Sequence, residues 1–127
     1  MTLIYAPISV GELVDKLTIL EIKKEQLRDP IRLSNVLAEE KELLKLLDNV
    51  VINNYDIIFN DLKKVNYGIW EGENTIRILS NENKLDSHFI DVAIKIREFN
   101  DKRSVIKHKL NMEVNSQIIE EKSFFEN

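Results

Sequence analysis

The chain has 127 residues, a formal net charge of −4, 43% hydrophobic and 31% charged residues, and no cysteine. A chain of this length can bury roughly two-thirds of its unfolded surface as one domain without a disulfide or a metal. The acidic balance argues against nucleic-acid or membrane-surface binding, and with no bilayer-spanning apolar run and no signal-peptide pattern a cytoplasmic protein is expected.

The first predicted elements are a short arm and a helix. Residues 3–8, "LIYAPI", are read as an extended arm, because Pro7 disfavours helix before it. Ser9 and Glu12 have the spacing of a capping box, which predicts a helix from about Val10 to Arg28. Ile19 and Ile22 lie opposite its main apolar stripe. A helix that is apolar on both sides is either central in the fold or paired with a second subunit.

The next two helices follow from start signals and leucine spacing. Asp29 is a suitable N-cap and Pro30 a suitable first residue for a helix that ends near Leu47. "DNVVINN" predicts a turn, and a third helix runs from about Ile52 to Leu79. Two glycines, Gly68 and Gly72, each cost about 1 kcal/mol relative to alanine inside a helix. They predict a kink or a break in the third helix.

The fourth helix is expected from about Ser87 to Met112, after the polar turn "SNENKLDS". The apolar residues of 113–127 show no clear helical or strand spacing. They suit a tail that docks against the body or another chain. Those side chains are Ile118, Ile119, Phe124 and Phe125. The chain as a whole is predicted to be one all-α domain, residues 1–127, built as an antiparallel helical bundle of about four long helices.

Every predicted helix carries charged side chains inside its apolar stripe when laid out at about 100° per residue. An isolated charge in such a position costs several kcal/mol, so these groups are expected to meet one another. Lys24 is expected to reach solvent instead. The predicted polar centre consists of Glu21, Glu40, Glu73, Arg77, Asn100, Arg103 and Lys107.

Two interpretations of this centre remain open. In the first, it is a satisfied ion-pair network that fixes helix register in an interaction or assembly module, expected to be a homodimer. In the second, it is partly open and belongs to a small enzyme or binding protein for an anionic metabolite, a sugar phosphate or a carboxylate. Arg77, Arg103 and Lys107 would then clamp the anion, and a glutamate would act as acid or base.

Motifs for a cofactor or a metal are missing from the sequence. There are only three glycines, and none forms a phosphate-binding loop. His88 and His108 are far apart, and no cysteine accompanies them, so no zinc site is expected. "EEKE" at residues 39–42 contains E-x-x-E, but a second carboxylate motif downstream is lacking. We read it as a solvated face around the inward Glu40.

Four segments together resemble a family of small bacterial and phage proteins of unknown function. They are "SVGELVDKLTILEIK", "GIWEGENTIR", "FNDKRSVIKHKLN" and "SQIIEEKSFF". The resemblance implies a mainly helical protein and brings no activity with it. The signature residues it implies are Glu12, Asp15, Lys16, Glu21, Lys23, Trp70, Glu73, Arg77, Asn100, Asp101, Arg103, Lys107, Glu120, Glu121 and Lys122. The chain departs from the pattern at Phe124, where tyrosine is expected, and at Gly72-Glu73-Asn74, where a Glu-Asp pair is expected.

Overall fold

The protein is all-α, as the sequence predicted. A computed structural model describes residues 2–123 and contains no strand in that range. Its four helices are α1 (Val10–Gln26), α2 (Pro30–Leu47), α3 (Tyr55–Asn81) and α4 (Ser87–Glu113). These boundaries lie within three residues of the predicted ones.

Short polar side chains cap the starts of three helices. Ser9 Oγ accepts a hydrogen bond from the Glu12 backbone N–H at 3.0 Å, so half of the predicted capping box is present. The Glu12 carboxylate binds Lys107 instead. Asp29 accepts from the second and third backbone N–H groups after it at α2, and Asp86 does the same at α4. These caps satisfy N–H groups that have no partner within the helix.

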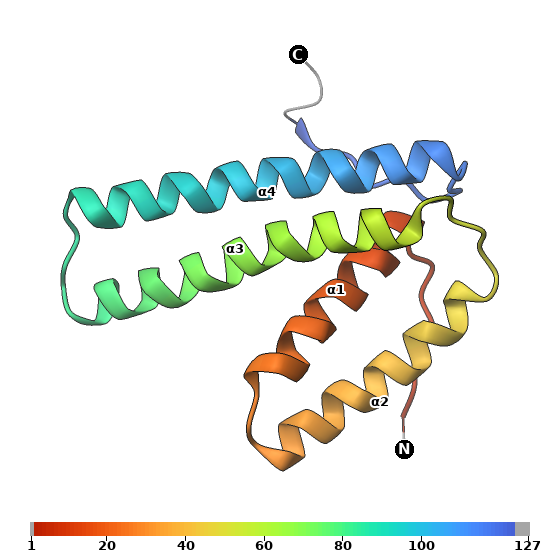
Figure 1. The fold of residues 1–127 in the computed structure, drawn as a ribbon, viewed down its shortest axis with the longest axis horizontal. Helices are drawn as coiled ribbons and strands as arrows, with labels where there is room; N and C mark the ends of the chain where they lie inside the picture. Colours follow the sequence, from red (N-terminus) through yellow and green to blue (C-terminus); the bar gives the residue numbers. More distant parts are fainter. Residues whose placement is uncertain (1, 124–127) are drawn as a thin grey trace.

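The helices form two hairpins of unequal length, α1–α2 and α3–α4 (Figure 1). At 1.5 Å per residue, the 27-residue helices α3 and α4 are about 40 Å long, whereas the 17-residue α1 is about 26 Å long. The far half of the α3–α4 hairpin therefore extends beyond the α1–α2 hairpin. Charged residues on this overhanging part, such as Glu73 and Arg77, are exposed because α1 does not cover them.

Helix α1 is the central helix. It packs against α2, α3 and α4, while α2 contacts only α1 among the described helices. Ile22, on the second apolar side of α1, is 1% exposed. The prediction that α1 is apolar on two sides because it is central is confirmed. Pairing of α1 with a second subunit stays a prediction.

The hydrophobic core lies where α1 meets the N-terminal half of α3 and the C-terminal half of α4. Val14, Leu62 and Leu110 are its fully buried centre. The partly buried side chains around them are Val10, Ile52, Tyr55, Ile58, Phe59, Ile106 and Val114. Because this core sits at one end of the α3–α4 hairpin, the other end is held together only by contacts between α3 and α4.

The glycines of α3 serve close packing, and the helix continues through both of them, so the predicted break is wrong and a kink stays a prediction. A Cβ atom at Gly68 would lie 2.6 Å from the Phe99 ring, and one at Gly72 would lie 2.6 Å from Ile96 Cγ1. Both contacts are with α4. The missing side chains therefore let α4 approach α3 closely along the hairpin.

The segment after α4 returns toward the start of α1. The Val10 backbone N–H donates to Ser116 Oγ at 3.2 Å, and the Ser116 hydroxyl donates to the Ile118 carbonyl at 2.7 Å. Phe124 and Phe125 lie outside the described residues. Within residues 2–123, no helix combines the length and the apolar character needed to cross a membrane.

Candidate functional site

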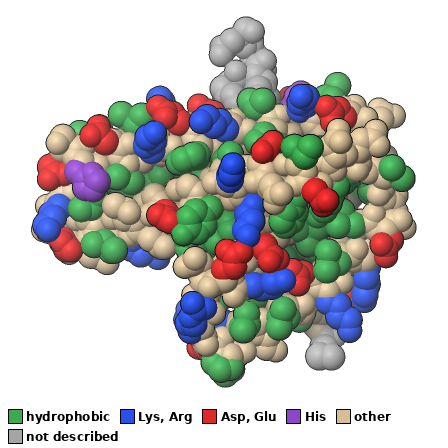
Figure 2. All heavy atoms as spheres, in the orientation of Figure 1, with side chains coloured by type: hydrophobic (Ala, Val, Ile, Leu, Met, Phe, Trp, Pro, Cys, Tyr) green, Lys and Arg blue, Asp and Glu red, His purple; other side chains and the backbone are tan. Residues whose placement is uncertain are grey.

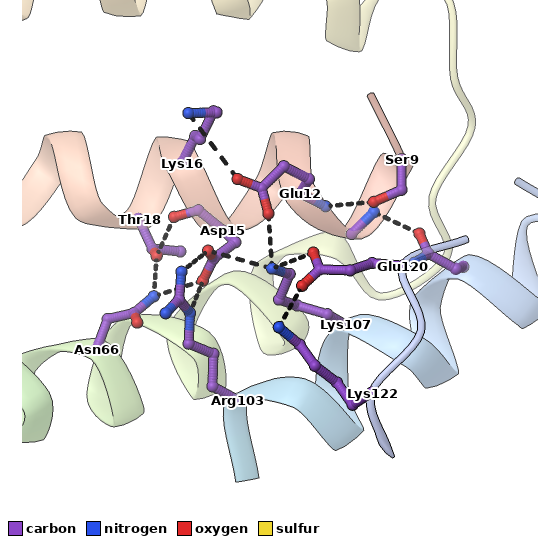
Figure 3. Close-up of polar contacts among 12 residues, drawn as sticks. Ser9, Glu12, Asp15, Lys16, Thr18, Asn66, Arg103, Lys107, Glu120 and Lys122 are labelled. Atoms are coloured by element: carbon purple, nitrogen blue, oxygen red, sulfur yellow. Dashed lines mark hydrogen bonds and ion pairs between the residues drawn. The ribbon is translucent and has the colours of Figure 1, made fainter. Parts of the chain in front are cut away.

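A buried ion pair joins α1 to α4. Arg103 Nε donates to Asp15 Oδ1 at 2.9 Å, and Arg103 Nη2 donates to Asp15 Oδ2 at 2.5 Å (Figure 3). Asp15 is 0% exposed, whereas the Arg103 side chain keeps 28% of its surface open. The planar guanidinium matches both carboxylate oxygens, which is the geometry that favours arginine over lysine.

Helix α3 completes the surroundings of the Asp15 carboxylate. The Asn66 side-chain amide donates to Asp15 Oδ1 and to Thr18 Oγ1, both at 2.8 Å. The Thr18 hydroxyl donates in turn to the Asp15 backbone carbonyl at 2.7 Å. Asn66 and Thr18 are buried, so a charged group deep in the protein has the hydrogen-bond partners it needs.

Lys107 brings the C-terminal segment into the same network. Its Nζ lies 2.6 Å from Glu12 Oε2, 3.7 Å from Asp15 Oδ2 and 3.3 Å from Glu120 Oε2 (Figure 3). Glu120 also pairs with Lys122 at 2.6 Å. We call these residues the α1–α4 charge cluster: Glu12, Asp15, Arg103, Lys107, Glu120 and Lys122. Its three carboxylates and three cations balance in charge.

A close backbone approach explains how α1 and α4 come within reach of each other. A Cβ atom at Gly11 would lie only 2.7 Å from the Lys107 carbonyl oxygen and 3.1 Å from its Cα. The Gly11 backbone N–H donates to Asn111 Oδ1 at 2.6 Å, and Asn111 is buried. Any larger residue than glycine would push the two helices apart at the cluster.

The surroundings shift the pKa of three cluster members away from their ordinary values. The hydrogen bonds to Asp15 raise the pKa of Arg103. Burial would lower the pKa of Lys107, but its hydrogen bond to Glu12 and the nearby carboxylates outweigh this and raise it. The hydrogen bond from Lys122, with the charge of Lys107, lowers the pKa of Glu120. All three groups are therefore held in their charged forms at neutral pH.

A polar pocket of about 440 Å³ opens to solvent above the cluster. Its lining is Glu12, Asn100, Asp101, Arg103, Ser104, Lys107, Glu120 and Lys122. The cations that face it already have carboxylate partners. The pocket therefore has no unmatched positive charge for an incoming anion.

A second ion-pair group lies on the other side of α1. Lys24 Nζ binds Glu40 Oε2 at 2.9 Å and Glu21 Oε2 at 3.0 Å, which joins α1 to α2. The hydrogen bond to Glu40, followed by that to Glu21, raises the pKa of Lys24. Lys24 was expected to reach solvent; its side chain keeps 29% of its surface open but is also paired with two carboxylates.

The structure divides the predicted polar centre into separate parts. Arg103 and Lys107 point inward as predicted, and Asn100 lines the pocket beside them. Glu21 and Glu40 belong to the Lys24 group on α1 and α2. Their predicted pairing with the cations of α4 is wrong.

Glu73 and Arg77 are exposed, so their predicted burial in the centre is also wrong. They lie on the half of α3 that extends beyond α1, where only α4 covers the helix. They line a groove between the two hairpins together with Trp70 and Arg103.

Asp15, the main partner of Arg103, was not among the residues predicted for the polar centre. The sequence held a signal for it, because Asp15 lies four and seven residues before Ile19 and Ile22. All three share the second side of α1, which faces α4 and the groove. Its burial follows from the same pattern that made α1 central.

The centre of the cluster is closed to solvent. Asp15 is closed off from solvent, and Asn66 and Arg103 bind its carboxylate. Within residues 2–123, no group of three or more histidine, cysteine or carboxylate side chains is placed to hold a metal ion. The geometry suits a lock between α1, α3, α4 and the C-terminal segment.

A family model described as a family of unknown function (DUF6165) matches residues 4–127. The match spans nearly the whole chain, so the chain belongs to this family, and the resemblance seen in the sequence is confirmed. Comparison with curated proteins and with solved structures gave no match.

Proposed function

We propose that this member of the DUF6165 family is a cytoplasmic helical assembly module that acts as a homodimer. In this proposal the α1–α4 charge cluster fixes how the two hairpins of one subunit pack together. The two copies exchange their N-terminal arms. The observation that carries it is an extended apolar arm, largely exposed and without a hydrogen bond to the rest of the described chain. A reciprocal exchange of this kind has the two-fold symmetry of most homodimers.

The arm presents three large apolar side chains to solvent. Leu3, Ile4 and Tyr5 are 57%, 83% and 88% exposed. No hydrogen bond joins residues 2–7 to the rest of the described chain. Covering three neighbouring apolar side chains with a second subunit would remove a substantial area from water, which favours association.

A receiving surface is available on α2. Leu37 and Leu44, two turns apart on one side of the helix, are 48% and 45% exposed. Leu44 borders a groove of about 430 Å³ that Tyr55 and Phe59 also line. Because α2 packs only on α1 among the described helices, this side of it is open to a partner. The aromatic and leucine side chains suit the apolar arm of a second copy.

The charge cluster supports the structural interpretation of the buried charges. Its cations are matched by carboxylates from α1 and the C-terminal segment, and its central carboxylate is sealed from solvent. Networks of this kind contribute little net stability but can specify how elements pair. If the two hairpins keep one relative position, the arm and the α2 surface also keep a constant distance and orientation to each other.

Size-exclusion chromatography with light scattering tests the dimer directly. The wild-type chain is expected to show twice its own mass of 14.9 kDa at micromolar concentration. Replacing Leu3, Ile4 and Tyr5 together with serine should give a monomer that keeps its helical circular dichroism. In the matched control, serine replaces three exposed apolar residues of the far α3–α4 hairpin: Ile78, Leu85 and Ile90. This variant should remain a dimer. A monomeric wild type, or a dimeric arm variant, would refute the proposal.

A further inference from the structure

The notch between the two hairpins contains a groove of about 530 Å³, a size typical of small-molecule sites. The notch is visible below the α3–α4 hairpin (Figure 2), and side chains of α1 and of the second half of α3 line the groove. The side chains that matter for its chemistry are Ile22, Arg32, Trp70, Glu73 and Arg77. They come from α1, α2 and α3, so the groove exists only because the hairpins are held at a fixed angle.

Two arginines of this groove form no ion pair within residues 2–123. Arg32, on the first turn of α2, and Arg77, on α3, are exposed and form no ion pair with any described residue. Arg103 also lines the groove, but Asp15 matches its charge. Against the one carboxylate of the groove, Glu73, these two guanidinium groups on different helices leave a local excess of positive charge in a chain of net charge −4, which favours an anion.

Part of the groove lining is apolar and includes a flat ring. Ile19, Ile22 and Ile69 line it next to Trp70, the only tryptophan of the chain. Indole rings stack on other flat rings and gain energy beyond the buried area alone. Glu73, without an ion-pair partner among residues 2–123, can accept hydrogen bonds from hydroxyl groups at the edge of the groove.

We propose that this groove binds a phosphate monoester attached to a flat ring, of the nucleoside monophosphate class. Arg32 and Arg77 bind the phosphate, whose charge at neutral pH is about −1.5 to −2 and matches two arginines. Trp70 stacks on the base, and Glu73 accepts from the sugar hydroxyls. The site is distinct from the arm and the α2 surface, so the inference goes beyond the assembly function and does not rest on it.

The fluorescence of Trp70 reports binding at this site without interference from another tryptophan. We would titrate the full chain with AMP, GMP, CMP and UMP, exciting at the red edge of tryptophan absorption, with adenosine and inorganic phosphate as separate arms. At least one monophosphate should change the emission saturably in the micromolar to low millimolar range. Adenosine and inorganic phosphate alone should each bind at least about tenfold more weakly, because each lacks one of the two recognised parts.

Matched arginine variants locate the phosphate. Arg77→Gln and Arg32→Gln should each weaken the binding about tenfold or more, while Arg97→Gln, an exposed arginine of α4 outside the groove, should leave it unchanged. Urea denaturation of each variant checks that the fold is intact. The arm variant should bind as the wild type does, so failure of the dimer and failure of this site are separate outcomes. Absence of saturable binding by all four monophosphates, or equal affinity in the Arg77→Gln variant, would overturn the inference.

Discussion

Arg103 on α4 binds both carboxylate oxygens of Asp15 on α1, which lies 88 residues earlier in the chain. The pair sits where the two hairpins cross, and Asn66 on α3 donates to the same carboxylate. Three of the four helices therefore meet at one buried charge. Because a charge in the interior must be fully satisfied, this contact tolerates few relative positions of α1, α3 and α4.

Replacing Gly11 with alanine should destabilise the protein by about 1 to 3 kcal/mol, because the new Cβ would lie 2.7 Å from the backbone oxygen of Lys107. Backbone atoms cannot move aside as a side chain can. Gly72→Ala is the comparison, since its Cβ would meet side chains only, Ile96 Cγ1 at 2.6 Å and Val92 Cγ1 at 3.9 Å, and alanine favours helix. Urea denaturation should show the larger loss for Gly11→Ala, and equal losses would count against a close contact there.

Replacing Asn66 with aspartate should cost about 2 to 3 kcal/mol at neutral pH. The change removes both hydrogen bonds that the amide donates and puts a second negative charge beside Asp15. Asn60→Asp makes the same chemical change at an exposed position of α3 and should have little effect. Chemical denaturation of the two variants measures the difference. A stable Asn66→Asp protein would show that the Asp15 site is open to water.

The contribution of Glu120 should depend on pH in the acidic range. Folding lowers the pKa of Glu120 below its ordinary value of 4.5, through Lys122 first and then Lys107. A carboxyl of this kind stabilises the folded state above its ordinary pKa, and the stabilisation is lost as the pH falls through the lowered value. Glu120→Gln should therefore be less stable than the wild type at pH 7, and the difference should shrink below pH 4.5.

The neighbouring Glu121 supplies the control for this pH effect. It is exposed and takes part in none of the ion pairs of the described residues, so Glu121→Gln should give a small difference that does not change with pH. Denaturant unfolding followed by circular dichroism at several pH values gives both curves. A Glu120→Gln difference that is constant from pH 7 to pH 3 would mean that Lys122 and Lys107 do not lower the pKa of Glu120.

Much of the fold could be predicted from local signals in the sequence. Ser9, Asp29 and Pro30 are start signals that act through neighbouring backbone groups, so the positions of α1 and α2 follow from them directly. The inward placement of Arg103 and Lys107 was also predictable, because apolar residues three and four positions away share their side of α4. Such patterns tell which side of a helix is buried.

The partners of those charges were not predictable in the same way. A helical wheel says nothing about where a helix ends relative to its neighbours, and Glu73 and Arg77 lie on the part of α3 that extends beyond α1. Asp15 was not predicted for the centre because it lies outside the main apolar stripe of α1, on the second side that it shares with Ile19 and Ile22. The crossing of α1 and α4 depends on Gly11 meeting Lys107, a contact between residues nearly 100 positions apart.

A double-mutant cycle on Asp15 and Arg103 tests most directly whether this pair locks the two hairpins together. The free energy of unfolding would be measured for the wild type, Asp15→Asn, Arg103→Gln and the double variant. We predict that each single change costs about 3 kcal/mol and that the coupling energy is at least about 2 kcal/mol, because either single change leaves a buried group without its partner. A coupling energy near zero, with additive single effects, would contradict the account.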